Sequence, residues 1–233
     1  MEDHSQSIGT PWRRGHLAAF YRAVAEMLLY PEDRNNERIA ADLAALADAP
    51  EEARNPLTSF LASPRASDLD EYLAVLELSP PCPLYLGSYI FDEPSSCLGA
   101  GLSSRNGYVI EVAAVYRHFG FENTGRELAD FLPLMTEFLA ASLERLERDG
   151  IGIRRRFVEH YVHPGLKPMR ERLVQYDSPY AGLVAGLEIA IERDRTLQAA
   201  DPIWVPPARV GRPPATVMSF RGRQPSALAG DTA

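Results

Sequence analysis

The sequence predicts an all-α fold, a single-domain helical bundle, and three observations support this prediction. Apolar residues recur at helical spacing in several separate stretches, and prolines and glycines fall between those stretches. No stretch of convincing length alternates with the period of two that a strand requires. Of the 233 residues 45% are hydrophobic, enough to bury a core of native size. We therefore expect one helical domain, residues 13–200, between a flexible arm, residues 1–12, and a disordered tail, residues 201–233.

The first half of the chain predicts one strong helix and several shorter ones. The strong helix has its apolar residues on one stripe that ends at Tyr30-Pro31, because proline cannot continue a helix: Leu17, Phe20, Tyr21, Val24, Met27 and Leu28. Shorter helices are expected over residues 36–50, 55–62 and 68–78, the last of these capped by Ser67 or Asp68. The proline-rich residues 80–83 form an extended connection, residues 84–91 fit a short helix, and residues 92–102 form a loop.

The second half predicts three clear helices and one shorter one. Helical spacing returns at Arg105 and stops at Gly120. The longest helix is expected to begin with Asp130 as its cap, to place Pro133 in its first turn and to end at Gly150. Its outer face is expected to carry Glu137. The remaining helices are expected over residues 153–162 and 178–195.

The charge of the chain restricts its partners. The 24 basic and 32 acidic residues leave a net charge of −8, and the tail with its four arginines and two aspartates puts about −10 on the folded body. Such a body repels nucleic acid and anionic membranes and attracts cationic segments. No stretch approaches the roughly 20 apolar residues of a membrane span, and the two cysteines fit a reducing cytoplasm, where we expect the protein to act.

Patterns of catalytic or metal-binding residues are weak. His160-x-x-His163 lacks a third ligand at a defined spacing, and Ser95-Ser96-Cys97 lacks the surroundings of a nucleophile. The Gly150-Ile151-Gly152 segment resembles a helix end more than a phosphate loop, and Arg154-Arg155-Arg156 is expected to be a solvated helix end. We therefore expect a binding protein that is not an enzyme and holds no metal or permanent cofactor.

One segment combines carboxylates with aromatic residues around a predicted helix start. Glu127, Asp130 and Glu137 fall beside Tyr116 and Phe131. Carboxylates pair with guanidinium groups and aromatic rings receive apolar groups, so this set suits a peptide that is both cationic and apolar. The alternative is that Asp130 caps its helix while the aromatic residues pack in the core.

The same segment resembles the motif of the nitrate reductase delta-subunit and TorD/DmsD-like family, the cytoplasmic chaperones that assemble molybdenum enzymes of the DMSO reductase superfamily. The matching residues are Tyr116, Gly120, Glu127, Leu128, Asp130, Leu132, Pro133, Glu137 and Phe138. Ala129 and Phe131 stand where the family has proline and histidine. Weaker likeness extends over residues 17–195 and includes Tyr72 to Glu77. Residues 87–94 and 105–108 are most similar to the delta proteins of type II enzymes, such as selenate, chlorate or perchlorate reductases and dimethylsulfide or ethylbenzene dehydrogenases.

The resemblance implies a TorD-like bundle that binds the immature catalytic subunit of a molybdenum oxidoreductase and its twin-arginine leader. The client, and not the chaperone, then carries the bis-molybdopterin guanine dinucleotide cofactor. The implied binding residues are Tyr72, Glu77, Tyr116, Glu127, Asp130, Phe131 and Glu137. A monomer is expected, with a dimer left open. A permanent structural subunit and a small helical metal-dependent hydrolase remain as alternatives.

Overall fold

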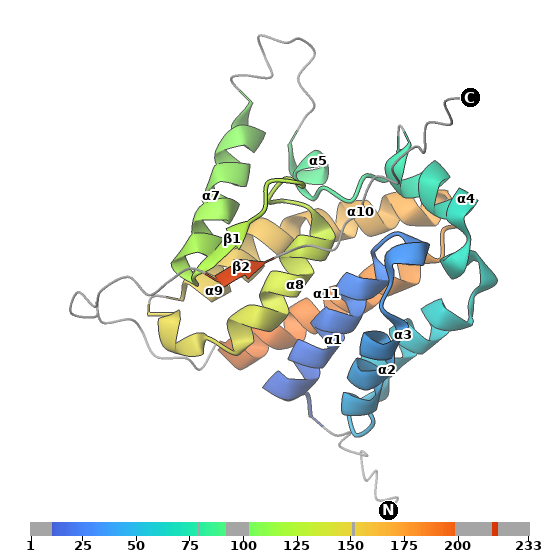
Figure 1. Ribbon diagram of the computed structural model, residues 1–233, viewed down its shortest axis with the longest axis horizontal. Helices are drawn as coiled ribbons and strands as arrows, with labels where there is room; N and C mark the ends of the chain where they lie inside the picture. Colours follow the sequence, from blue (N-terminus) through green and yellow to red (C-terminus); the bar gives the residue numbers. More distant parts are fainter. Residues whose placement is uncertain (1–10, 79, 92–102, 151, 199–215, 219–233) are drawn as a thin grey trace, which may run out of the picture.

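The computed structural model describes residues 11–78, 80–91, 103–150, 152–198 and 216–218 (Figure 1). The described chain is mostly helical and forms one all-α bundle, as the sequence predicts. Its α-helices and strands are α1 Arg14–Met27, α2 Asn36–Ala45, α3 Glu51–Ala62, α4 Leu69–Tyr72, α5 Gly87–Ile90, α7 Ser104–His118, β1 Phe121–Asn123, α8 Leu132–Leu143, α9 Ile153–Arg156, α10 His163–Gln175, α11 Tyr180–Gln198 and β2 Thr216–Met218. Short 3-10 helices cover Pro31–Asp33, Pro64–Ser67 and Leu146–Arg148, and π-helices cover Leu73–Glu77 and Phe157–Val162. None of the described helices is both long and apolar enough to cross a membrane.

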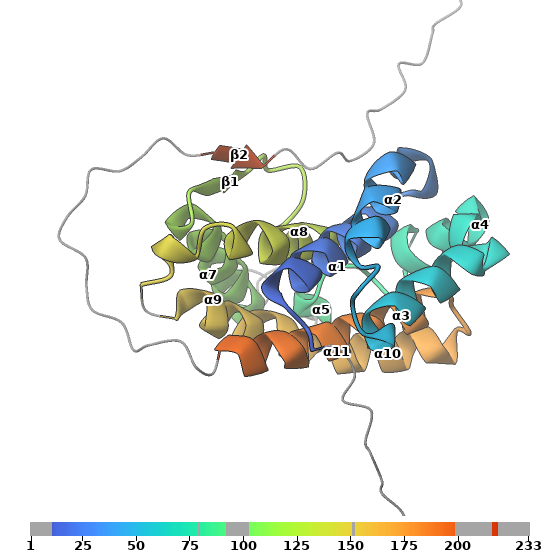
Figure 2. The ribbon, with the colours of Figure 1, turned by 90° about the horizontal axis from the view of Figure 1, so that it is seen from below.

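Helix α1 lies at the centre of the bundle. The whole predicted stripe, from Leu17 to Leu28, has no exposed surface, and even His16 and Glu26 are buried. In Figure 2, α10 and α11 lie side by side along one side of the molecule, the strands lie at the opposite rim, and α1 and α8 lie between them. The apolar residues of α1 thus meet helices on several sides, which makes α1 the axis around which the core is built.

Helix α8 packs along α1 in the opposite direction and is shorter than predicted. Arg22 of α1 lies 3.6 Å from Glu144 just after the end of α8. The α8 helix ends at Leu143, so the prediction that the longest helix runs to Gly150 is wrong; the 19-residue α11 is longer than the 12-residue α8. Beyond Leu143 the arginines turn inward, and Arg145 and Arg148 each donate to the carbonyl of Phe119 over 3.0 Å. These tertiary contacts replace the next helical turns.

The helical run after Gly152 is longer than predicted. The sequence predicts a helix from Ile153 to Val162. Instead α9, the π-helix and α10 continue one another from Ile153 to Gln175. Pro164 stands in the first turn of α10, directly after the π-helix, where the wider turn accommodates a ring that an ordinary helix interior excludes.

The helices between α1 and α5 follow the prediction with shifted ends. Helix α2 ends at Ala45, before the predicted end, and α3 begins at Glu51, before the predicted start. The side chain of Asp68 caps α4 by accepting from the amide of Asp70 over 2.9 Å, as predicted. The short helix predicted within residues 84–91 is present as α5.

Two short strands form a small sheet in the described chain. Strand β1 pairs in parallel with β2, with Phe121 opposite Thr216 and Asn123 opposite Met218. The predicted loop 92–102 and most of the predicted arm and tail lie outside the described residues. Residues 216–218 of the predicted disordered tail, however, form β2 against the body. The tail prediction is therefore wrong for these three residues, because their pairing with β1 is a long-range contact.

Candidate functional site

The predicted binding motif occupies the loop between β1 and α8, where Asp130 is completely buried. Its carboxylate oxygen Oδ2 accepts from the amide of Gly87 over 3.1 Å and from Nη2 and Nε of Arg105 over 3.1 and 3.3 Å. Helix α8 begins one residue after Phe131 without a side-chain cap. The prediction that Asp130 caps this helix is therefore wrong: its carboxylate faces inward and joins the loop to α5 and α7.

Residues 84–87 pair with the motif along their backbones. The amide of Leu86 donates to the carbonyl of Asp130 over 3.0 Å, and the amide of Leu132 donates to the carbonyl of Leu84 over 2.7 Å. Between these two bonds Tyr85 and Phe131 form an isolated antiparallel bridge, and their rings lie 5.2 Å apart. Phe131 is 9% exposed, so most of this predicted contact residue is covered by the protein itself.

Glu127 is the carboxylate of the motif that reaches the surface. It is half-buried, and it accepts a hydrogen bond of 2.5 Å from the hydroxyl of Tyr85. Burial raises the pKa of Tyr85 and the hydrogen bond to Glu127 raises it further, so the hydroxyl remains a donor to the carboxylate. The neighbouring Leu128 is 51% exposed. An anionic group and an apolar side chain thus lie together at the surface of this loop.

Tyr72 is the last residue of α4, and Glu77 is the last residue of the π-helix that follows it. The Tyr72 ring is buried, and its hydroxyl donates to the carbonyl of Leu28 over 3.3 Å. Burial raises the pKa of Tyr72, and the charges of Glu77 and Glu127 add to the shift. Glu77 itself is exposed, as is Leu78, with 65% of its surface accessible. We call the surface formed by Glu127 and Leu128 the acidic-apolar face.

Tyr116 and Glu137 do not belong to this face. Tyr116 is fully buried, and its ring lies 4.7 Å from that of Phe138 in a tilted arrangement. Its hydroxyl donates to the carbonyl of Ala129 over 2.7 Å, so it supports the motif from the core side. Glu137 points toward α1 and α2. Burial raises its pKa, the nearby Arg38 lowers it and Glu26 raises it again. The prediction that Glu137 lies on the outer face of its helix is therefore wrong.

The position of Glu137 predicts a pH dependence of stability. The pKa of Glu137 in the folded protein lies above its value in the unfolded chain, so folding favours the protonated carboxyl group. Its contribution to stability is therefore greatest below the pKa of the unfolded state, and it is lost as the pH rises through the pKa of the folded state. Glu137→Gln removes this titration. In urea unfolding at pH 5 and pH 8, we expect the variant to lose less stability between the two values than the wild type does. An equal loss in both proteins would contradict this placement of Glu137.

Three members of the site were missed as binding residues: Tyr85, Gly87 and Arg105. An added Cβ at Gly87 would lie 2.5 Å from Oδ2 of Asp130 and 2.8 Å from Nε of Arg105, so only glycine fits here. Arg105 also lies 5.9 Å from the centre of the Tyr85 ring. Neighbouring residues in the sequence give no signal for these contacts, because the partners are 20 to 43 residues apart.

The other sequence candidates have ordinary structural roles. Nε2 of His163 lies 3.0 Å from a carboxylate oxygen of Glu192, which pairs the histidine with α11. Within the described residues no group of three or more His, Cys, Asp or Glu gathers as a metal site would require. Ser95, Ser96 and Cys97 lie outside those residues. Arg154 is fully buried, so the predicted solvated helix end is wrong at this position.

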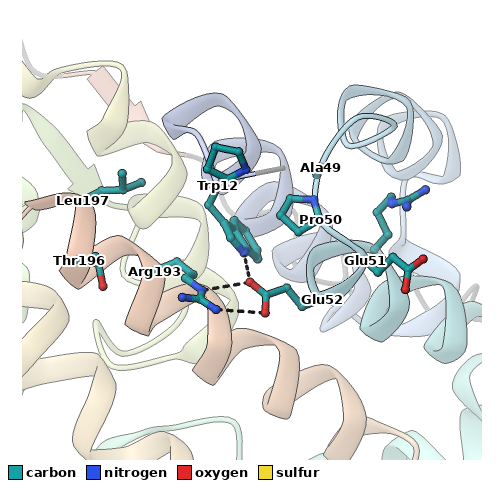
Figure 3. A pocket seen from close by; sticks show the side chains of 10 residues that line it. Trp12, Ala49, Pro50, Glu51, Glu52, Arg193, Thr196 and Leu197 are labelled. Atoms are coloured by element: carbon teal, nitrogen blue, oxygen red, sulfur yellow. Dashed lines mark hydrogen bonds and ion pairs between the residues drawn. The ribbon is translucent and has the colours of Figure 1, made fainter. Parts of the chain in front are cut away.

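A separate pocket of about 840 Å³ opens where α1 begins, beside α3 and the end of α11 (Figure 3). At its centre Glu52 accepts from Nε1 of Trp12 over 2.6 Å, and from Arg193 over 3.0 and 3.2 Å (Figure 3). The charges at the centre of the pocket therefore pair with each other. The hydrogen bonds between Glu52 and Arg193 join α3 to α11. None of the predicted binding residues lines this pocket, so it is separate from the acidic-apolar face.

No protein-family model matches the chain, and no curated protein matches it either. The geometry of the fold and of the motif loop is therefore the basis on which a function is proposed.

Proposed function

We propose that the protein is a cytoplasmic assembly chaperone that binds the immature catalytic subunit of a molybdenum enzyme. The observation that carries the proposal is the acidic-apolar face, where Glu127 and Leu128 of the motif lie together at the surface. A carboxylate pairs with guanidinium, and exposed leucines receive apolar side chains. A twin-arginine leader combines these two features in one short segment.

The burial of Asp130 gives it a positioning role in this proposal. Its carboxylate interacts with Gly87 and Arg105 inside the protein, and the following bridge between Tyr85 and Phe131 fixes the loop. Glu127 is then held by Tyr85 in a defined place at the surface. Pre-positioning of this kind lowers the entropy that binding must overcome. Tyr116 supports the same loop through Ala129.

In the proposed mechanism the chaperone masks its client and then releases it. The chaperone holds the catalytic subunit until the bis-molybdopterin guanine dinucleotide cofactor is inserted, and it delays export meanwhile. No covalent bond is made or broken, and the cofactor belongs to the client. A permanent structural subunit would instead copurify with the mature enzyme in a fixed ratio, so fractionation of the mature complex distinguishes the two functions.

Calorimetric titration with a synthetic twin-arginine leader tests the proposal through Glu127. We expect Glu127→Gln to weaken binding by about tenfold, because a charge-assisted bond to guanidinium contributes roughly 1.5 kcal/mol more than a neutral contact. A leader with both arginines changed to lysine should also bind the wild type more weakly, because lysine lacks the planar fork of arginine.

The matched control for this titration is Glu147→Gln. Glu147 is exposed and lies beyond the far end of α8, so its substitution changes the net charge equally without altering the acidic-apolar face. It should leave the affinity within about twofold of the wild type. Equal affinities for both variants would refute the assignment of Glu127, and no binding of the leader to any form would refute leader recognition.

A further inference from the structure

Strand β1 leads directly into the loop that carries Glu127. The side-chain amide of Asn123 donates to the carbonyl of Glu127 over 2.7 Å, and the amide of Gly125 donates to the side chain of Asn123 over 3.1 Å. Gly125 has a φ of +78°, a conformation that glycine adopts without strain. This hydrogen-bonded turn places the backbone edge of β1 next to the acidic-apolar face.

The position of β1 is fixed from the core side. Phe121 is 5% exposed and meets the ring of Phe138 edge-on at 6.0 Å. The guanidinium of Arg145 lies 4.3 Å from the centre of the Phe121 ring. These contacts come from α8 and the turn after it, and none of them involves β2. The position of β1 is therefore supported by core contacts that do not depend on β2.

Strand β2 occupies that edge through the backbone of only three residues. Thr216, Val217 and Met218 pair in parallel with Phe121, Glu122 and Asn123 (Figures 1 and 2). In the described part of the chain, this pair is the whole sheet. A two-stranded pair of this length has few hydrogen bonds and is marginal on its own. Backbone pairing also tolerates many sequences, so another extended segment fits the same edge.

We propose that the edge of β1 is a docking site for an extended segment of the client, and that Thr216–Met218 is a built-in competitor for it. The identity of the client rests on the proposed function, whereas the displacement of β2 does not. The client segment would add to β1 as a strand, while its cationic part reaches Glu127 four residues farther along the chain. The tail of residues 201–233 carries four arginines against a body of about −10, so tail and client share the same electrostatic attraction.

Hydrogen exchange on the full-length chain tests whether β2 is the occupant. In a parallel pair of strands, one of any two consecutive residues points its N–H toward the partner strand. The double variant Val217→Pro, Met218→Pro must therefore lose one of the N–H groups that pair β2 with β1, because proline has no backbone N–H. The matched control, Val217→Ala, Met218→Ala, keeps both donors. Among the amides of Phe121–Asn123, we expect at least one to exchange about tenfold faster in the proline variant. Equal exchange in the two variants would overturn the proposal.

A peptide of residues 211–223 tests the competition without any client. An internal segment that occupies a site lowers the apparent affinity of an external ligand in proportion to the fraction of time that the site is free. If the edge of β1 is free one-tenth of the time, the peptide should bind about tenfold more weakly than it would to a fully free edge. The labelled peptide should therefore bind the proline variant about tenfold more tightly than the alanine variant. Equal affinities, or no binding to the proline variant, would contradict a displaceable strand.

The twin-arginine leader, extended by the following residues of the catalytic subunit, gives the last comparison. It should also bind the proline variant more tightly than the alanine variant. Equal, measurable binding to both would overturn the competition with the client. Binding to neither variant would refute the proposed function, while the exchange and peptide results would still decide the displacement of β2.

Discussion

Arg154→Met is expected to lower the free energy of unfolding by about 3–5 kcal/mol, because it leaves a buried carboxylate without its partner. Arg154 is completely buried, and its two terminal nitrogens donate to both oxygens of Asp194 over 2.6 and 2.7 Å. It also donates to Ser142 and to the carbonyl of Leu139. On the other side of Asp194, the hydroxyl of Tyr21 donates over 2.8 Å. One side chain thus connects α9 with α8, α11 and, through Asp194, α1.

The charges in this network favour the ionised pair. Burial lowers the pKa of Arg154, but the charge and hydrogen bonds of Asp194 more than offset this effect, so the net shift is upward. Burial next to Asp194 also raises the pKa of Tyr21, whose hydroxyl therefore stays protonated as a donor. Removal of the guanidinium leaves Asp194, 1% exposed, with only Tyr21 and Gln198 as donors.

Chemical denaturation of Arg154→Met beside Arg155→Met measures this effect. Arg155 is exposed and pairs with Glu159 one turn later, so its loss should change stability by less than about 0.5 kcal/mol. The double variant Arg154→Met, Asp194→Leu removes both charges and should regain much of the stability, since an apolar pair leaves no isolated charge. Equal stabilities of Arg154→Met and Arg155→Met would show that the buried pair does not join the helices.

The prediction of the fold succeeded where the signal lies within one element. The stripe from Leu17 to Leu28 repeats with the helical period, and each of its members is buried in α1 or at its C-cap. The cap at Asp68 is likewise local, because acceptor and donors are two or three residues apart. Periodicity and capping report on the chain itself, so a single sequence contains enough information to place these helices.

The errors share one cause, which is a partner far away in the sequence. Arg154 sits among exposed arginines and acidic residues, and its partner Asp194 is 40 residues away. Helix α8 stops at Leu143 because two arginines turn toward the carbonyl of Phe119. Glu137 lies near Glu26 of α1 and Arg38 of α2. The apolar period of α8 identifies the face that packs in the core, but it does not show that other helices also cover the opposite face. Local charge and period do not encode such contacts.

The candidate site divides in the same way. The motif from Glu127 to Pro133 was found because its residues are adjacent, and the structure keeps residues 127–131 in one loop that leads into α8 at Leu132. Which carboxylate reaches the surface was not predictable, because that depends on Gly87 and Arg105. Asp130 lies inward against these two residues, while Glu127 remains outside beside Tyr85. The distinction between a residue that positions the loop and one that faces a partner thus arises from tertiary packing alone.

Gly87→Ala is expected to destabilise the protein by about 1–3 kcal/mol, the usual effect of an added methyl group in a packed interior. The new Cβ would overlap Oδ2 of Asp130 and Nε of Arg105, at 2.5 and 2.8 Å. The Asp130 carboxylate must then move, and the loop that it anchors moves with it. Because Glu127 lies on that loop, leader binding should weaken several-fold even in conditions where the variant is fully folded.

Gly107→Ala is the control for Gly87→Ala, since both add one methyl group and Gly107 lies in the same helix as Arg105. Gly107 lies within α7, and a Cβ at that position meets nothing within 4 Å. Alanine is favoured over glycine in a helix by about 1 kcal/mol, so this variant should be at least as stable as the wild type and bind the leader equally well. Urea unfolding and calorimetric titration of the two variants compare both properties. If Gly87→Ala matched Gly107→Ala in stability and affinity, the buried pair of Asp130 and Arg105 would not be what holds Glu127 in position.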